Sequence, residues 1–249
     1  MNRKSMVVLS VLIALVLLLT ACAPAATKVS VATDATFKPF EYKDDAGNLV
    51  GFDIDMMNKI AEKAGLQIEW VNVPFESLLA GLATCQYDAA AAAISINPDR
   101  VKNMLFSDPY LDAGLVVVVQ KGSTTINSKD DLKNLKVAAQ LGTTGEIEAK
   151  KIEGVTYKPY DSYDLAFLDL SNGQIDAVIA DNPVALGFIA ANPDTLKTAG
   201  PVFNSEQYGI AICKTNTDLQ AKINTALKGL VDDGTITELA KKYLNPAAQ

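Results

Sequence analysis

Short runs of apolar and β-branched residues alternate along the chain with segments whose apolar residues recur at helical spacing. The strands predicted from the apolar runs are Val29 to Thr33, Leu66 to Val73, Tyr87 to Ile94, Leu115 to Gln120, Val137 to Leu141, Ala177 to Ala180 and Gly209 to Cys213. Because strands and helices alternate, we predict an α/β fold of mainly parallel sheets flanked by helices.

The clearest helical pattern follows Asp53, where Ile54, Met57 and Ile60 fall on one face and Gly65 is a typical terminator. We expect Asp53 to cap this helix and its apolar residues to lie in the core. The other predicted helices are Ser77 to Thr84, Ser162 to Ser171, Pro183 to Ala191, Asp218 to Val231 and Thr235 to Tyr243.

Two stretches about ninety residues apart resemble each other. A predicted helix from Ser77 leads to Gln86-Tyr87-Asp88-Ala89, and a predicted helix from Ser162 leads to Gln174-Ile175-Asp176-Ala177. Each copy is a helix, a turn and a strand. This internal similarity favours two lobes with related structures. The alternative is a chance similarity between two strand-and-helix units.

Ligands in open α/β sheets bind beyond the carboxyl ends of strands, so the residues after each repeated strand are the first candidates. These are Ile94 to Arg100 and Asp181 to Asn182. Arg100 offers a planar fork that holds carboxylate oxygens bidentately, and Ser95 adds a hydroxyl and a backbone N–H. Asn97-Pro98-Asp99-Arg100 is also typical of a turn into a helix, so a surface arginine is the alternative.

The N-terminus has the layout of a bacterial lipoprotein signal peptide over residues 1–21. Arg3 and Lys4 precede an apolar stretch from Met6 to Leu19 that is shorter than the roughly 20 residues of a membrane span. Leu19-Thr20-Ala21-Cys22 resembles a lipobox, which predicts cleavage and lipidation at Cys22; a secreted protein with an incidental Cys22 is the alternative. Residues 22–27 would then form a short tether to the folded body.

Composition excludes several classes of function. Removal of Arg3 and Lys4 leaves 20 basic against 29 acidic side chains, a net charge near −9, so nucleic acid is not an expected partner. The chain has no histidine, and its body has only Cys85 and Cys213, so we expect no metal site, no cofactor and no His-dependent triad. The two cysteines lie far apart in sequence, which favours separate buried thiols over a disulfide.

Six blocks in order resemble the bacterial extracellular solute-binding proteins of the polar amino-acid transporter family. The match runs from about Val29 to Tyr243. The blocks are Thr33-Asp34-Ala35-Thr36-Phe37-Lys38-Pro39-Phe40-Glu41-Tyr42, Gly51-Phe52-Asp53-Ile54-Asp55, Ile94-Ser95-Ile96-Asn97-Pro98-Asp99-Arg100, Phe106-Ser107-Asp108-Pro109-Tyr110, Gln140-Leu141-Gly142-Thr143-Thr144-Gly145 and Asp176-Ala177-Val178-Ile179-Ala180-Asp181. The resemblance implies a type II periplasmic-binding-protein fold whose two lobes close on an amino acid.

The resemblance also implies a role for each residue at the α-carbon end of that ligand. Arg100, Ser95 and the backbone of Ala93 would bind there, with Thr143 and Thr144 as a second carboxylate clamp from the other lobe. A Gly-Thr-Thr-Gly turn alone is more often a helix cap. Many relatives have larger residues and a glycine near Ala93, so this chain departs from the family pattern at that position.

The remaining matched residues would bind the ligand ammonium and the ligand side chain. Asp181 matches the ammonium-binding carboxylate, and its alternative is an N-cap for the next helix. Asp34, Phe37 and Phe52 match a pocket in which two aromatic rings sandwich the ligand and an acid contacts its distal polar group. By the same resemblance, Gln140 would point into this pocket. We expect arginine to bind best, followed by glutamine, lysine or histidine.

The implied organisation is lobe 1 at residues 28–113 plus 207–249 and lobe 2 at residues 114–206. We expect a monomeric receptor for an ABC importer, anchored to a bacterial membrane through lipid on Cys22 and in contact with permease subunits. An exported cyclohexadienyl dehydratase-like enzyme is one alternative, because Asp34 or Asp181 can act as a general acid. A sensor module is a weaker alternative, because the chain ends at Gln249 without a signalling domain.

Overall fold

The computed structural model describes residues 27–244. The predicted signal peptide and the lipidation site at Cys22 therefore lie outside the described residues. Within residues 27–244, none of the helices has the length and apolar character needed to cross a membrane.

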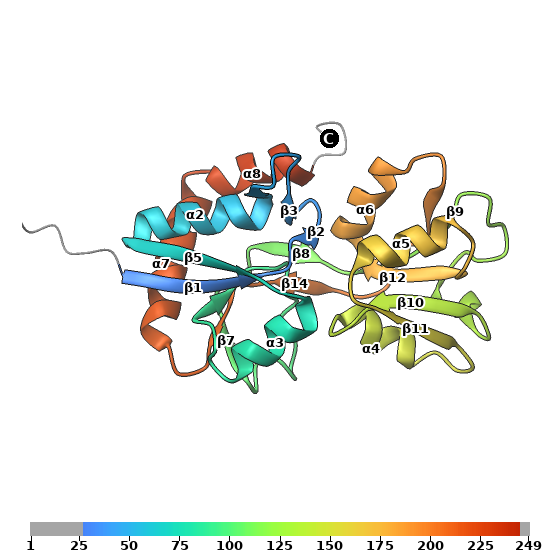
Figure 1. The fold of residues 1–249 in the computed structure, drawn as a ribbon, viewed down its shortest axis with the longest axis horizontal. Coiled ribbons are helices and arrows are strands. Elements are labelled where there is room, and N and C mark those ends of the chain that lie inside the picture. The colour runs from blue at the N-terminus through green and yellow to red at the C-terminus, as the bar shows by residue number, and fades with distance from the viewer. Residues whose placement is uncertain (1–26, 245–249) are drawn as a thin grey trace, which may run out of the picture.

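Two five-stranded sheets lie side by side and define two lobes (Figure 1). Lobe 1 is built on a sheet in the order β5 (Leu66–Asn72), β1 (Thr27–Thr33), β6 (Ala89–Ala90), β15 (Ala211–Cys213) and β7 (Met104–Phe106). Lobe 2 is built on a sheet in the order β11 (Thr156–Tyr160), β10 (Lys136–Gln140), β12 (Ala177–Asp181), β9 (Leu115–Gln120) and β13 (Leu196–Ala199). The predicted α/β class is confirmed.

Helices cover both faces of each sheet, as parallel strands require. In lobe 1, α2 (Phe52–Ala64), α7 (Thr217–Asp232) and α8 (Thr235–Leu244) pack on one face and α3 (Phe75–Ala83) on the other. In lobe 2, α5 (Tyr163–Ser171) and α6 (Asn182–Ala191) cover one face, and α4 (Thr144–Lys150) with the short 3₁₀ helix η1 (Lys129–Leu132) covers the other. Burial alternates along the strands accordingly: Val29 and Val31 face α2, whereas Ala32 faces α3.

The two lobes repeat one unit. In each, the first strand pairs in parallel with the next two, as β5-β1-β6 and as β11-β10-β12. The repeated aspartates make the same hydrogen bond in both copies. The carboxylate of Asp88 accepts the backbone N–H of Ser30 at 2.8 Å, and the carboxylate of Asp176 accepts the backbone N–H of Lys136 at 2.7 Å. The internal similarity in the sequence is thus a structural repeat in which an aspartate ties the third strand to the first.

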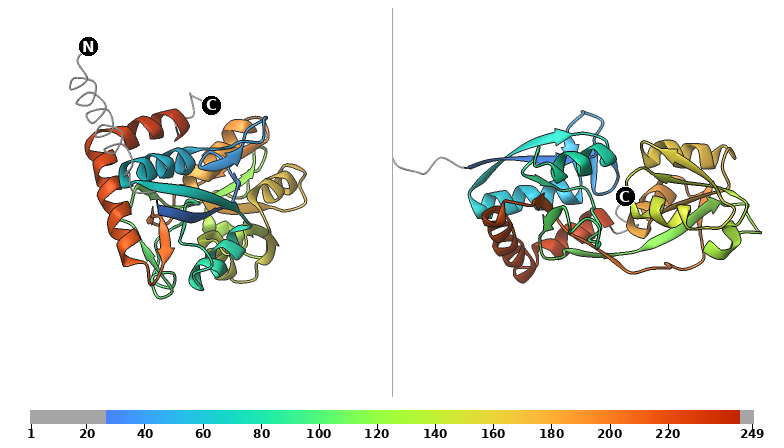
Figure 2. Two further views of the ribbon diagram at one scale, coloured as in Figure 1. Left: turned by 60° about the vertical axis from the view of Figure 1, so that its left-hand side comes forward. Right: turned by 90° about the horizontal axis from the view of Figure 1, so that it is seen from below.

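Two short strands connect the lobes. β8 (Leu111–Ala113) pairs antiparallel with β14 (Glu206–Tyr208), and both run between the two sheets (Figures 1 and 2). The chain passes to lobe 2 after β8 and returns through β14, after which β15 joins the first sheet beside β6 and β7. A smaller sheet of β2 (Thr36–Phe37), β3 (Glu41–Lys43) and β4 (Leu49–Val50) follows β1.

Two local expectations are wrong. Helix α2 begins at Phe52, so Gly51 and not Asp53 occupies its N-cap position. Position 51 requires glycine, because a Cβ there would lie 2.1 Å from the carbonyl oxygen of Phe40. The predicted strand from Tyr87 to Ile94 is also shorter, since β6 ends at Ala90 and Ala93 has a φ of 45°. Both departures lie near the carboxyl end of the lobe 1 sheet.

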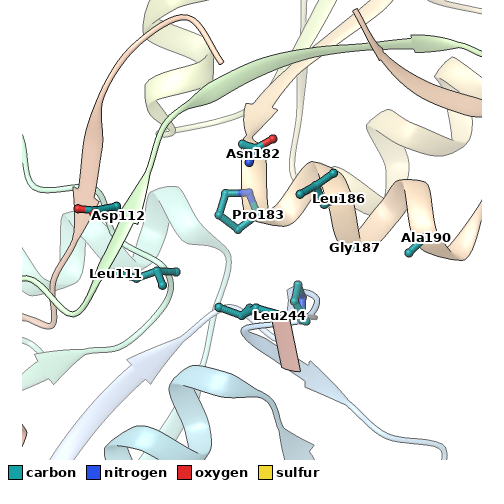
Figure 3. Close-up of a pocket in the computed structure, with 9 residues that line it drawn as sticks. Leu111, Asp112, Asn182, Pro183, Leu186, Gly187, Ala190 and Leu244 are labelled. Carbon is teal, nitrogen blue, oxygen red and sulfur yellow. The ribbon is translucent and has the colours of Figure 1, made fainter. Parts of the chain in front are cut away.

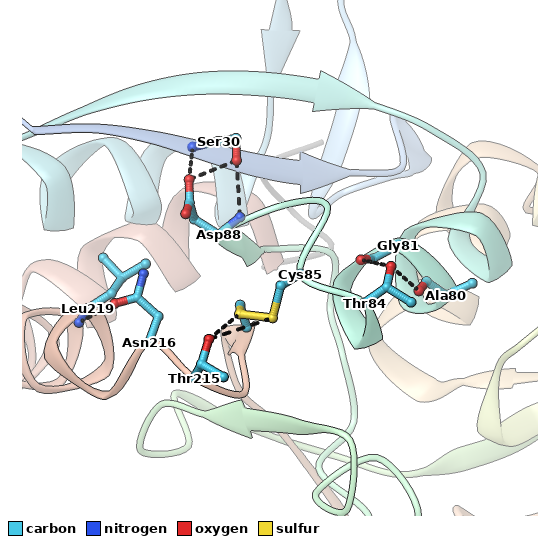
Figure 4. The surroundings of a disulfide bond; sticks show 10 residues. Ser30, Ala80, Gly81, Thr84, Cys85, Asp88, Thr215, Asn216 and Leu219 are labelled. Carbon is cyan, nitrogen blue, oxygen red and sulfur yellow. Dashed lines mark hydrogen bonds between the residues drawn. A yellow bond between two sulfur atoms is a disulfide. The ribbon is translucent and has the colours of Figure 1, made fainter.

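The prediction of two separate thiols is also wrong, because Cys85 and Cys213 form a disulfide with Cα atoms 5.0 Å apart (Figure 4). The antiparallel return of β15 beside β6 places Cys213 next to the turn that holds Cys85. The N–H of Cys213 donates to the carbonyl of Asp88 at 2.9 Å, which fixes that neighbourhood. The two cysteines are 128 residues apart in the sequence, and only the topology of the sheet brings them together.

Candidate functional site

The candidate site lies where the carboxyl ends of four strands meet between the lobes. Asp34 follows β1, and the turn through Ala93 follows β6 in lobe 1. Gln140 and Asp181 are the last residues of β10 and β12 in lobe 2. Parallel strands end at one edge of a sheet, so each lobe presents its polar residues to the other.

Arg100 lies between the lobes and is 8% exposed. Its Nη1 donates to the carbonyl of Ser95 at 2.7 Å, and its Nη2 donates across the cleft to the carbonyl of Gly142 at 2.9 Å. The guanidinium lies 5.4 Å from the centre of the Phe75 ring. Burial lowers the pKa of Arg100, and the charges of Asp181 and Glu206 oppose that shift. The side chain is therefore a buried cation, and the surface alternative is excluded.

Asp181 provides a buried carboxylate at the other side of the site, 3% exposed. Its backbone occupies the N-cap position of α6, but its side chain accepts no capping hydrogen bond, and Pro183 lacks an N–H that could donate one. Within residues 27–244, Oδ1 of Asp181 has no hydrogen-bond partner. Burial, with the neighbouring charge of Glu206, raises the pKa of Asp181 to about 7, while Arg100 acts in the opposite direction. The carboxylate is suited to accept a cationic group.

Asp34 and Gln140 meet from opposite lobes. Nε2 of Gln140 donates to Oδ2 of Asp34 at 2.8 Å and to the carbonyl of Asp161 at 3.0 Å. Asp34 also accepts the hydroxyl of Thr36 at 2.9 Å and the N–H of Phe75 at 3.1 Å. Burial raises the pKa of Asp34 despite these donors. Oε1 of Gln140 is buried and has no partner in the described part of the chain, so an acceptor is available beside an acid.

The aromatic wall differs from the predicted one. Phe37 lies beside Phe75, with ring centres 6.1 Å apart and planes at 10°, and beside Tyr163 of lobe 2 at 5.4 Å. Phe52 instead packs against Phe40 and Tyr110 within lobe 1. The structure therefore brings Phe75, and not Phe52, next to Phe37.

The position of Phe75 in the sequence could have identified it as a site residue, because it follows the end of a strand. It opens α3 only three residues after the end of β5, whose last residue pairs with Thr33 of β1, so it lies at the same sheet edge as Asp34. Phe52 opens α2 behind Gly51, where its ring enters the lobe 1 core and is 0% exposed.

Thr143 and Thr144 begin α4 opposite Arg100. Thr143 is the N-cap, since its Oγ1 accepts the N–H of Glu146 at 3.2 Å and donates to the carbonyl of Gln140 at 2.7 Å. The hydroxyl of Thr144 donates to Glu206 at 2.9 Å. Both hydroxyls are thus engaged within the protein, which leaves backbone groups for any ligand contact.

Ala93 and Ser95 form the turn that precedes Arg100. Both are buried, and the N–H of Ala93 donates to Asp53 at 2.8 Å. Ser95 bridges to Tyr208 of β14. The sequence did not single out Tyr208 or Glu206, yet both lie close enough to shift the pKa of Asp181. The returning strand is what brings them to the site.

The lobes are in contact in this structure. Besides the bonds of Arg100 and Gln140, a Cβ at Gly187 of α6 would lie 3.0 Å from Pro39 of lobe 1. A separate pocket of about 200 Å³ lies beside the crossovers, with Leu111 and Leu244 facing Pro183 and Gly187 (Figure 3). None of the predicted ligand-binding residues lines that pocket. No group of His, Cys, Asp or Glu side chains suited to a metal ion occurs between residues 27 and 244.

Two α/β lobes joined by paired crossover strands, with a buried cation and a buried carboxylate between them, define a two-lobed solute-binding protein of the type II periplasmic-binding fold. The chain belongs to the bacterial extracellular solute-binding proteins, family 3, whose family model matches residues 29–246. This is an extracytoplasmic family.

The chain is similar to known amino-acid-binding proteins both in sequence and in structure. The chain is 36% identical over 226 residues to the putative ABC transporter arginine-binding protein 2 of Escherichia coli K12, covering 89% of this chain and 92% of the relative. It is 41% identical to an ancestral arginine-binding protein solved with arginine, with a TM-score of 0.85, covering 89% of this chain and 100% of that one. It is 34% identical to an ancestral amino acid-binding protein that is a precursor of cyclohexadienyl dehydratase, with a TM-score of 0.82, covering 88% and 96%.

Proposed function

We propose that this protein is the substrate-binding receptor of an ABC importer and captures a polar or basic L-amino acid between its two lobes. The observation that carries the proposal is a buried guanidinium, Arg100, and a buried acid, Asp181, between the lobes, close enough that each shifts the pKa of the other. A zwitterion supplies the complementary pair, a carboxylate for the guanidinium and an ammonium for the acid. Such matching compensates the desolvation of four charges at once.

The other end of the cleft determines which amino acid binds best. Asp34 supplies a carboxylate, and Gln140 supplies a buried amide oxygen that accepts an N–H. Phe37 and Phe75 are nearly parallel and provide faces on which a guanidinium stacks. Arginine satisfies all three groups, and the relatives named above support it. Glutamine, lysine and histidine satisfy fewer of them and are expected to bind more weakly.

The receptor is anchored outside the cytoplasm by lipid on Cys22 after removal of residues 1–21, with 22–27 as tether. It acts as a monomer that delivers its ligand to permease subunits. The boundaries that fit this role are residues 28–113 plus 207–249 for lobe 1 and 114–206 for lobe 2. Replacing Cys22 with Ser should release the protein from membranes without changing ligand affinity, and a carbonate-resistant membrane pellet would contradict the anchor.

A binding role without catalysis is favoured over an exported dehydratase. The dehydratase precursor among the similar structures is itself a binding protein, and the complete amino-acid clamp fits a ligand that is held and released. Asp181, with a pKa raised to about 7, is chemically able to donate a proton, so the alternative is testable. Incubation of the purified protein with arogenate or prephenate should leave both substrates unchanged.

A thermal-shift screen of the twenty amino acids tests the main proposal. A ligand at 100 times its dissociation constant adds roughly 2.7 kcal/mol to the free energy of unfolding. Arginine should produce the largest shift and glutamine a smaller one. Absence of a shift with every amino acid, checked by calorimetry with arginine, would refute the proposed function.

A further inference from the structure

Ala93 has a backbone conformation that its side chain disfavours. Its φ is 45°, in the left-handed region that residues other than glycine seldom adopt, and its side chain is 2% exposed. It lies between β6 and Ser95, at the point where the chain turns toward Arg100. Such strain persists only where the surroundings enforce it.

The enforcing contact comes from Asp53. One oxygen of this carboxylate, Oδ2, accepts the N–H of Ala93 at 2.8 Å and the hydroxyl of Tyr110 at 2.8 Å. Asp53 is 0% exposed, so the two bonds form away from water. Burial raises the pKa of this carboxyl to about 7, while the bonds from Ala93 and Tyr110 act in the opposite direction because they favour its ionised form.

Asp53 is itself fixed in place by the start of α2. Its N–H donates to the carbonyl of Phe40 at 3.0 Å, and Gly51 lets the start of the helix approach the backbone of Phe40 closely. The carboxylate therefore has a defined position relative to the turn. A residue from the first helix of lobe 1 thus reaches the turn that carries the ligand-binding groups.

The turn beyond Ala93 is held from the other side as well. The N–H of Gly209 donates to the carbonyl of Ile94 at 3.1 Å, and the carbonyl of Ser95 accepts Nη1 of Arg100 at 2.7 Å. Ala93 lies between β6 and these fixed points, so its conformation decides how β6 joins the turn. Relaxation of Ala93 to a negative φ would displace Ser95 and, through it, the guanidinium.

We propose that Asp53 is a positioning residue that holds Ala93 in the left-handed conformation and thereby presets Ser95 and Arg100 for the α-carbon end of the ligand. This inference rests on the proposed function, since it names what prepares that site before a ligand arrives. If Asp53 served only the stability of the fold, a different result is expected. Replacing Asp53 and its partner Tyr110 by apolar groups of similar shape would then leave ligand binding intact in a folded protein.

The test compares Asp53→Leu/Tyr110→Phe with Asp53→Asn and Tyr110→Phe. The double variant removes the acceptor without leaving the phenol unpaired, and its affinity for arginine and for glutamine should fall by about tenfold or more, by the same factor for both. Asp53→Asn keeps an oxygen that accepts the Ala93 N–H and should bind within about threefold of wild type, as should Tyr110→Phe.

The variant Ala93→Gly provides the deciding measurement. Because glycine adopts a positive φ without an external hold, Ala93→Gly added to the double variant should restore affinity to within about threefold of wild type. Calorimetry measures each affinity, and circular dichroism with melting curves checks each fold. A folded double variant that binds normally, or one that Ala93→Gly does not rescue, would overturn the proposal.

A measurement on the unmodified protein covers the case in which the double variant does not fold. The Ala93 amide of the ligand-free receptor should exchange its hydrogen slowly, as a held N–H does, and exchange at the rate of an exposed amide would overturn the proposal. Failure of the proposed function has a different signature, because wild-type protein would then bind no amino acid.

Discussion

Gln140 of lobe 2 donates through Nε2 to the carboxylate of Asp34 in lobe 1, across 2.8 Å of the cleft. The bond joins the lobes at the end of the site that would meet the ligand side chain. It also leaves Oε1 of Gln140 without a partner in the described residues, facing the same region as the acid. The pair therefore joins the lobes at the position where, under the proposed function, the ligand side chain is selected.

Replacement of Asp34 by Asn should weaken arginine much more than glutamine. The substitution removes the charge that a guanidinium needs but keeps size and hydrogen-bonding capacity, so the loss for arginine should be about tenfold or more. Calorimetry with both ligands gives the ratio. Asp164→Asn is the matched control, because this acid is exposed and its charge acts on Asp34 from outside the site, so its removal should change neither affinity by more than about twofold. Equal weakening of both ligands would make Asp34 a structural residue.

Arg100→Ala should abolish binding of every amino acid tested. The side chain is the buried cation of the site, and loss of one partner of a buried ion pair costs about 3–5 kcal/mol, or more than a hundredfold in affinity. Lys102→Ala serves as control, because Lys102 is two residues away and exposed in a pair with Asp99. Affinity of Arg100→Ala within a few fold of wild type would show that the carboxylate binds elsewhere.

Gly187→Val should weaken ligands of all kinds by opposing closure. A Cβ at this position would lie 3.0 Å from Pro39 and 3.1 Å from the carbonyl of Lys38, so a larger side chain on α6 pushes the lobes apart. A ligand that binds the closed form then loses affinity in proportion to the closed population. Gly229→Val is the control, since Gly229 is also helical but has only the flexible Lys63 side chain nearby. Small-angle scattering should show a more open ligand-free protein for Gly187→Val alone.

Removal of the disulfide should lower stability without changing affinity. Replacing Cys85 and Cys213 by Ala opens a loop of 128 residues in sequence, for which a loss of about 2–5 kcal/mol is expected. Cys85 has a φ of 58°, so Gly at that position should be less destabilising than Ala. Denaturant melts of the two double variants measure both effects. A greater loss with Gly than with Ala would contradict the backbone argument.

Much of this architecture was predictable from local patterns. The α/β class and the helices from Ser162 and Thr235 follow from apolar periodicity, and the repeat around Asp88 and Asp176 marks equivalent parts of the two lobes. The rule that ligands bind beyond strand ends selected Asp181 and the segment that ends at Arg100, whereas Asp34 and Gln140 were selected by the family resemblance.

The remaining features depend on contacts between distant segments, which no local pattern contains. Glu206 and the Cys85–Cys213 bond require knowledge that the chain returns to lobe 1. The exchange of Phe52 for Phe75 has a different cause, because both open a helix and only the packing of each helix decides where its ring points. A residue could be assigned to the site when its position follows from the end of a single strand. It could not be assigned when its position depends on how two elements pack against each other.

Binding should weaken as pH falls below about 7, because the ligand ammonium needs Asp181 in its charged form. Burial raises the pKa of this carboxyl to about 7 in the ligand-free protein, and a bound ammonium favours ionisation, so binding releases a proton at lower pH. Affinity for arginine should thus be constant from about pH 7.5 to 8.5 and fall by up to about tenfold per unit at lower pH.

Stability of the ligand-free protein should respond to Asp181 with the opposite sign. A carboxyl with a folded pKa near 7 and an unfolded value near 3.8 binds its proton more tightly in the folded state, so its contribution to stability is full below pH 3.8 and is lost as pH rises through 7. Asp181→Asn removes both effects while keeping the shape. The difference in melting temperature between wild type and variant should therefore move in favour of the variant between pH 5 and 8. Arg100, Glu206 and Tyr208 face the carboxyl and are unchanged in the comparison, so a difference that does not vary with pH would show that Asp181 is already ionised before the ligand binds.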